Sequence, residues 1–169
     1  MEAATIRRNE LVQIQKKTEN KREYHEEEAA EKLLFSTLFD FSQMFLKMSE
    51  EEKALQLFQS AHEVIISLGE TKELAQVYFE IGKIYMKRNE YGKTEKYLEH
   101  VLTFYRKSGN YEILFNCLYM LGFIHFSRKY YKIAIPFLVE AIEMNDKLSY
   151  DMVKLSSTMH YLGVSLLKK

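Results

Sequence analysis

The chain has 169 residues, which is long enough for one domain with a sizeable hydrophobic core. Lysine and arginine together number 24, as do aspartate and glutamate, so no net charge draws the chain toward nucleic acid or an anionic membrane surface. With one proline and six glycines, the chain has few of the residues that form tight turns or break helices, which favours long helices.

The single cysteine and the N-terminal residues bear on the compartment. Cys117 has no second cysteine to form an intramolecular disulfide and suits a reducing environment. No apolar run approaches the roughly 20 residues that cross a bilayer, and the first eight residues lack the apolar stretch of a secretory signal. We therefore expect a cytoplasmic protein that contacts no membrane and no nucleic acid.

Residues 1–30 differ from the rest of the chain and are expected to form a helix and a charged lead-in. Ile6, Leu11, Val12 and Ile14 give a short apolar stripe, which predicts a helix up to about Lys17. Asn20, with a glutamate three residues later, predicts the N-cap of a second helix that enters the first repeat. The charged stretch 21–28 is typical of a solvated helix face.

A spacing of about forty residues organises the remaining chain, residues 31–169. One motif places a large residue three positions before an apolar-Gly pair and another three positions after it. A second motif follows twelve residues after each glycine, and such linked motifs at a fixed period are the signature of a helical-repeat array. The first motif reads Tyr78-x-x-Ile81-Gly82-x-x-Tyr85, Leu118-x-x-Leu121-Gly122-x-x-His125 and Met159-x-x-Leu162-Gly163-x-x-Leu166, with a degenerate copy Leu38-x-x-Phe41-Ser42-x-x-Phe45; the second reads Ala54-x3-Phe58-x2-Ala61, Thr94-x3-Leu98-x2-Val101 and Ala134-x3-Leu138-x2-Ala141.

Each repeat is predicted to hold two antiparallel helices, A and B, in units of about 31–70, 71–110 and 111–150. In the second unit we expect helix A at 73–88 and helix B at 91–107. Gly69 and Gly109, with Ser149 in the third place, stand where a left-handed residue closes helix B. The glycine inside helix A leaves room for a neighbouring helix, at a cost of roughly 1 kcal/mol against alanine.

A half repeat, 151–169, ends the sequence with helix A alone, predicted from Asp151 to Leu167. Arrays of this kind normally end in a polar capping element, and here the motif leaves an apolar face without a helix B. Three explanations are open: this helix caps the array, the chain belongs to something longer, or it pairs with a second copy through the C-terminal helix.

These motifs resemble the tetratricopeptide repeat over residues 31–169. The resemblance implies an all-α, right-handed superhelical solenoid of antiparallel helix pairs that binds a peptide or protein partner. The stretch 131–142 is also similar to the long repeats of the Rap, NprR and PlcR group, which are receptors for small secreted peptides in Gram-positive bacteria. Forty-residue repeats occur as well in eukaryotic scaffolds such as the kinesin light chain.

The resemblance further implies a concave groove lined by the A helices. A second stripe on these helices lies roughly 130° from the motif stripe at about 100° per residue, and it mixes aromatic rings with amides. Packing against neighbouring helices is the alternative for Phe123, together with Met86 and Phe126. The expected peptide-binding residues are Phe39, Gln43, Gln76, Phe79, Lys83, Asn116, Tyr119, Phe123 and His160.

The chemistry of an enzyme is nearly absent from the sequence. The five histidines form no spaced pair with a carboxylate or with Cys117, and no glycine-rich phosphate loop occurs. We expect no catalytic residue, no metal and no cofactor. The leading hypothesis is a peptide- or protein-binding module, in its finest form the sensory part of a bacterial peptide-pheromone (quorum-sensing) regulator. The alternatives are a structural scaffold or adaptor and, by analogy with Rap proteins, a response-regulator phosphatase acting through Gln13 or Gln15.

Overall fold

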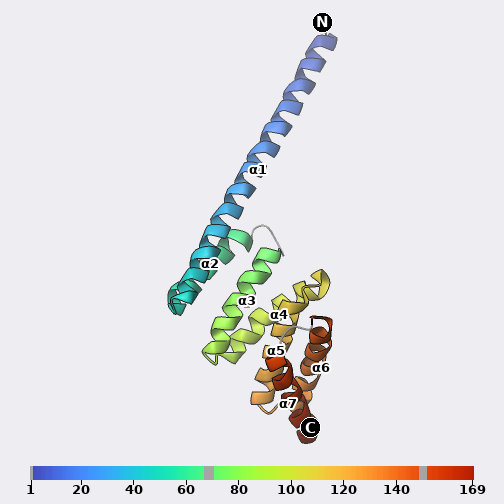
Figure 1. The fold of residues 1–169 in the computed structure, drawn as a ribbon. Coiled ribbons are helices and arrows are strands. Elements are labelled where there is room, and N and C mark those ends of the chain that lie inside the picture. The colour runs from blue at the N-terminus through green and yellow to red at the C-terminus, as the bar shows by residue number, and fades with distance from the viewer. Residues whose placement is uncertain (1, 67–70, 149–151) are drawn as a thin grey trace.

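The computed structural model describes the backbone of residues 2–66, 71–148 and 152–169, with the side chains of residues 16, 17, 20–66, 71–145 and 152–169. In these ranges the chain is all helix, without strands, and consecutive helices pack as antiparallel pairs along a right-handed solenoid (Figure 1). The fold class expected from the sequence is therefore confirmed. The helices are α1 (Glu2–Lys47), α2 (Glu51–Ile65), α3 (Lys72–Lys87), α4 (Tyr91–Ser108), α5 (Tyr111–Ser127), α6 (Tyr131–Leu148) and α7 (Met152–Lys168).

The A helices are the C-terminal part of α1, then α3, α5 and α7, and the B helices are α2, α4 and α6. The predicted bounds of the second unit are confirmed to within one residue. The Thr71 and Asn110 side chains cap α3 and α5 by accepting hydrogen bonds of 3.2 Å from the N–H groups of Leu74 and Ile113. Gly109 closes α4 with a φ of 81°, as predicted, whereas Gly69 and Ser149 lie outside the described residues.

The turn from A to B repeats with the same period as the motifs. Ser49, Asn89 and Lys129 adopt left-handed backbone conformations with φ of 62°, 59° and 64°. In each turn the next N–H reaches back five residues, for example from Glu90 to the Tyr85 carbonyl at 2.9 Å. This is the Schellman arrangement, here built without glycine.

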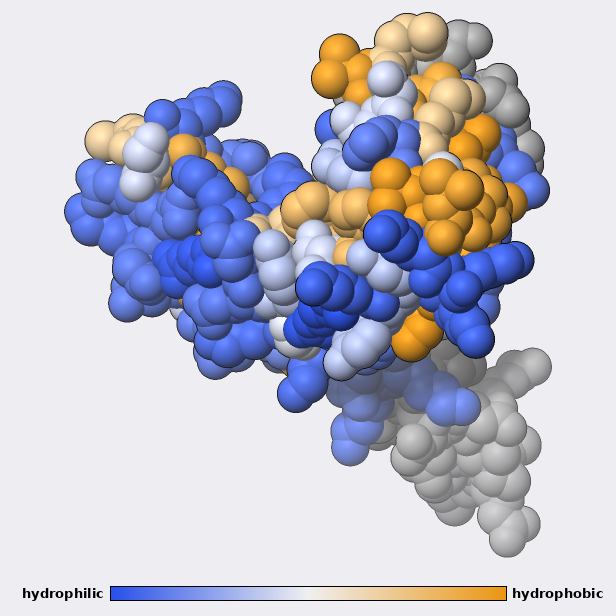
Figure 2. Space-filling view, turned by 90° about the horizontal axis from the view of Figure 1, so that it is seen from below, coloured by the Kyte–Doolittle hydropathy of each residue, from blue (hydrophilic) through white to orange (hydrophobic). Residues whose placement is uncertain are grey.

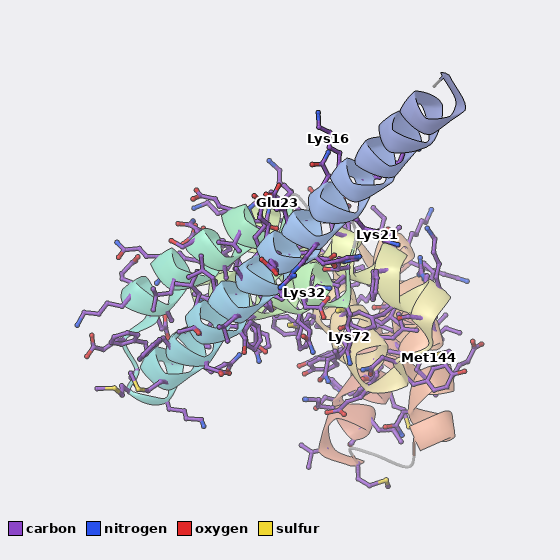
Figure 3. The ribbon with its side chains drawn as sticks, turned by 90° about the horizontal axis from the view of Figure 1, so that it is seen from above. Lys16, Lys21, Glu23, Lys32, Lys72 and Met144 are labelled. Carbon is purple, nitrogen blue, oxygen red and sulfur yellow. The ribbon has the colours of Figure 1, made fainter. Side chains whose placement is uncertain are left out.

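The predicted break near residue 18 is wrong, because α1 runs without interruption through Asn20. No glycine or proline occurs between residues 2 and 47, and ion pairs such as Arg22–Glu26 at 2.9 Å link successive turns. The N-terminal half of α1 projects from the array (Figure 1), and Lys16, Lys21 and Glu23 extend from different sides of it (Figure 3). The boundary at residue 30 falls inside this helix and stays a prediction.

The core follows the repeat motif. Two clusters of buried side chains occupy successive units, and α3 contributes to both. At the centre of the second and third A–B pairs a leucine of helix B covers the glycine of helix A, whereas the first pair has Ser42 and Phe58 at these positions. A Cβ added to Gly122 would lie 2.5 Å from Leu138 Cδ2, and one added to Gly82 would lie 3.1 Å from Leu98 Cδ2. Nothing lies within 4 Å of the corresponding point at Gly163, beside which the described residues place no helix B.

Alanine at these glycines provides a matched test of the repeat register. Gly122→Ala should lower the free energy of unfolding, because overpacking costs about 1–3 kcal/mol and exceeds the gain of roughly 1 kcal/mol in helix propensity. Gly163→Ala should raise it by up to about 1 kcal/mol, since only the propensity changes. Urea titrations followed by circular dichroism measure both. Equal effects at the two sites would show that the register of the glycines is misassigned.

Candidate functional site

The two sides of the array differ in how closely their helices approach one another. Along the A side, α3 contacts α5 and α5 contacts α7. The B helices α2, α4 and α6 show no comparable contact among the described residues. Close approach on one side and separation on the other bend the array, so that α3, α5 and α7 line its inner face. Figure 2 shows the molecule hollowed between a mostly hydrophilic lobe on the left and a more hydrophobic lobe on the right, the side on which α7 ends.

The residues expected to bind a peptide lie on the A helices, outside the buried stripe of the repeat motif. Lys83 and His160 are exposed, and the others are half-buried: Phe39, Gln43, Gln76, Phe79, Asn116, Tyr119 and Phe123. Gln43 and Gln76 make no side-chain hydrogen bond to another described residue. Their amides therefore have donors and acceptors to offer to a ligand.

The lysine and the ring on α3 are already paired with each other. The Lys83 ammonium lies 5.2 Å from the centroid of the Phe79 ring and donates a hydrogen bond of 2.8 Å to Glu80 Oε1. The Phe79 ring also packs against the core cluster of the second and third units. This part of the inner face thus presents an apolar ring with a compensated charge at its edge.

Asn116 is held by the next A helix. Its Nδ2 donates to the Glu112 carbonyl at 2.9 Å, and its Oδ1 accepts from Lys154 Nζ of α7 at 2.7 Å. A peptide backbone that used this amide would therefore compete with Lys154. The Asn116–Lys154 bond joins α5 to α7 in the same place where the sequence predicted a ligand contact.

Tyr161 of α7 is the residue of the inner face that the sequence analysis missed. Its ring lies 6.3 Å from Tyr119, 5.5 Å from Phe123 and 4.8 Å from Phe126, measured between centroids. Packing against a neighbouring A helix, the alternative raised for Phe123 and Phe126, is therefore part of their role. In the first unit, the Phe39 ring contacts Phe58 of its own helix B, α2, with 5.5 Å between centroids. The sequence signal for Tyr161 was an aromatic residue one position after His160, where the earlier units hold Glu80 and Met120.

Among the titratable groups of the described residues, His125 Nδ1 lies 3.7 Å from Glu95 Oε1. Cys117 is completely buried, and burial raises the pKa of its thiol far above the usual range, as in an inert core cysteine. Nowhere among the described side chains do three or more His, Cys, Asp or Glu residues gather as they would around a metal ion. Within the same ranges, no helix combines the length and apolar character that a transmembrane segment needs.

Two stretches of the chain, residues 75–108 and 115–148, match the family model of the tetratricopeptide repeat. The matches begin forty residues apart, so the extra residues of each repeat, 109–114, lie where α4 ends and α5 begins. The tetratricopeptide character predicted from the motifs is confirmed for these two units. A comparison with curated proteins gives no match.

Solved structures with the same fold extend this likeness along the chain. BtubC (BKLC) from P. vanneervenii covers 82% of the chain with a TM-score of 0.69 at 16% sequence identity. A crystal structure from P. anserina, described as a kinesin light chain with nearly identical TPR-like repeats, covers 79% with a TM-score of 0.61 at 13% identity. The chain spans 57% and 66% of the length of these two proteins. At such identities the likeness establishes the fold alone.

Tyr161→Ala should loosen the last helix from the array. Removing a half-buried ring that contacts three aromatic residues of α5 should cost about 1–3 kcal/mol of unfolding free energy, somewhat less than the loss of a fully buried ring. Tyr161→Phe should be nearly neutral, because the ring keeps its contacts. Hydrogen exchange resolves the effect along the chain, and protection should fall in α7 first. Equal loss of protection in α2 and α7 would contradict the assignment.

Proposed function

We propose that this tetratricopeptide-repeat array is a binding module that holds an extended peptide, or an extended segment of a protein partner, along the inner face of its A helices. The observation that carries the proposal is the half-exposed mixture of rings and amides outside the core stripe. Apolar surface of this kind is costly to leave in water. The rings of Phe79 and Tyr119 would contact the side chains of the peptide, and the amides of Gln76 and Asn116 would pair with its backbone.

The resemblance to the Rap, NprR and PlcR group supports the finer form of this proposal. In that form the ligand is a short signalling peptide, and the chain is the sensory part of a bacterial quorum-sensing regulator. Binding needs no chemical step, which agrees with the expectation that the chain is not an enzyme. The inner face carries both amide donors and ring surface, so it suits a peptide of mixed polarity better than a purely charged one.

Assembly is the second candidate function, and the outer face of α7 favours it. Met159, Leu162 and Leu166 repeat the motif that is covered by helix B in the middle units. Here Met159 is 51% exposed and Leu166 is 47% exposed, and Gly163 has an open surface beside it. Met152, Leu155, Met159, Leu162 and Leu166 follow the three-four spacing of a coiled-coil seam. A homodimer through α7 would cover this face, and in that form the array is a scaffold.

Tyr119→Ala tests the binding proposal. Peptides are first selected from a random display library on the wild-type chain and then titrated calorimetrically against the variants. Truncating an aromatic anchor should weaken binding by roughly 2 kcal/mol, about thirtyfold. Gln76→Ala should weaken it less and leave the thermal melt unchanged. Thr103→Ala, an exposed site on α4, serves as the control. Selected peptides that bound all four proteins equally would remove the inner face from consideration.

Leu166→Glu tests assembly through α7. Since Leu166 is half exposed, its charged variant should fold, and it should be monomeric by light scattering where the wild type is dimeric. Leu167→Glu, about 100° further around the helix, is the matched control and should remain dimeric. A wild-type chain that scatters as a monomer at high concentration would rule out the homodimer.

A further inference from the structure

A second surface lies on the opposite side of the array, in the gap between the B helices α2 and α4. A cleft of about 440 Å³ opens there, with α3 as its floor, and this volume is in the usual range for ligand sites. Its walls bring together four basic or imidazole side chains and a group of tyrosines. They include His62 of α2, Tyr78 of α3, and Lys93, Lys96, Tyr97 and His100 of α4.

The next gap, between α4 and α6, shows that this composition is specific to the first. A cleft of about 470 Å³ occupies the equivalent place over α5. Forty residues on from each basic position of the first cleft, the chain carries an apolar or acidic residue: Leu102 for His62, Ile133 for Lys93, Pro136 for Lys96 and Glu140 for His100. The repeat geometry alone therefore makes the gap, and the repeat does not carry the basic residues of the first cleft into the second.

The charges of the two clefts are also compensated differently. In the second cleft, Arg128 donates to both carboxylate oxygens of Glu95 at 2.8 and 2.9 Å, and Arg106 pairs with Glu140 across the gap. Among the described residues, those that line the first cleft include no carboxylate. Lys93 is paired at 2.6 Å with Glu90 outside the lining, whereas Lys96 forms no ion pair with any described residue. The first cleft therefore holds an ammonium group, that of Lys96, with no ion-pair partner among the described residues.

Tyr78 forms the centre of the aromatic wall. Its ring centroid lies 5.4 Å from His62, 5.2 Å from His100 and 5.6 Å from Tyr97, and its hydroxyl is 3.1 Å from His62 Nε2. Burial raises the pKa of Tyr78 and of Tyr97, so both phenols keep their protons at neutral pH. The wall therefore offers O–H donors and flat apolar surface, with ammonium groups at one edge.

We propose that this cleft binds an acidic peptide segment of a protein partner, with a carboxylate held by Lys96 and Lys93. The donors of the cleft outnumber its acceptors, which favours an anionic group. The methylenes and backbone beside that carboxylate would lie against Tyr78 and Tyr97. The site is separate from the inner face of the A helices, so the two proposed binding sites can be tested independently of each other.

The five histidines of the chain provide the readout. The full chain, labelled at its histidine rings, is titrated with a hexaglutamate peptide and followed by NMR, with assignments from single His→Gln variants. The ring signals of His62 and His100 should shift saturably, while those of His25, His125 and His160 stay in place. Hexaglutamine should produce no shift. Replacing both cleft lysines (Lys93→Gln with Lys96→Gln) should weaken binding at least fivefold. The same loss of charge at Lys107 and Lys168 should change it less than twofold.

Several results would overturn the proposal. Equal shifts of all five histidines would indicate a diffuse charge effect, and the absence of any shift at His62 and His100 would remove the site. A shift of His160 alone would place the acidic peptide on the A-helix face. Inorganic phosphate producing the same saturable shifts at the same concentration would show a general anion site with no selectivity for a peptide carboxylate.

Discussion

The close contact between the glycine of helix A and the leucine of helix B is the constraint on which the array depends. At Gly122 there is no room for even one further carbon beside Leu138, which is itself completely buried. A helix pair held this closely has one register, because sliding either helix would replace the glycine by a bulkier side chain. The same contact recurs at Gly82 with Leu98, so successive units have nearly the same internal geometry and differ mainly at their surfaces.

The repeated helix pair gives the array two different faces: an inner face formed by the A helices and an outer face formed by the B helices. Contacts between A helices draw the inner face together, and its rings share their surface between the neighbouring helix and the solvent, as Tyr119 and Phe123 do against Tyr161. The B helices diverge, and clefts remain between them. Side chains at the gaps are therefore free of the packing demands of the core, which is why one gap can be basic and aromatic while the next contains closed ion pairs.

Features that recur with the forty-residue period, such as helix bounds and the buried glycine, were predicted from the sequence. Features that depend on contacts between different repeat units were missed. Helix bounds, the buried glycine and the closure of α4 by Gly109 all follow from local patterns of apolar residues and turn chemistry. The continuity of α1 was missed because an N-cap residue such as Asn20 marks a helix start only if the preceding turn ends. The left-handed turn at Lys129 could not be predicted, because a lysine rather than a glycine occupies the position of positive φ. Tyr161 and the cleft of Tyr78 and Lys96 require knowing which helices adjoin.

A comparison of the two ends of the array with its middle shows that the burial of a motif residue depends on the helices packed beside it. Phe41, Ile81 and Leu121 occupy the same position of the motif, yet Phe41 is 50% exposed while Ile81 and Leu121 are almost fully buried. The middle residues lie between two units, whereas Phe41 has no unit before it among the described residues. Gly163 is the mirror case at the other end, since the helix that would cover it is absent from the described chain. A motif that specifies core in the middle of a solenoid therefore leaves apolar groups exposed at the ends of the described array, such as Phe41 at one end and Leu166 at the other.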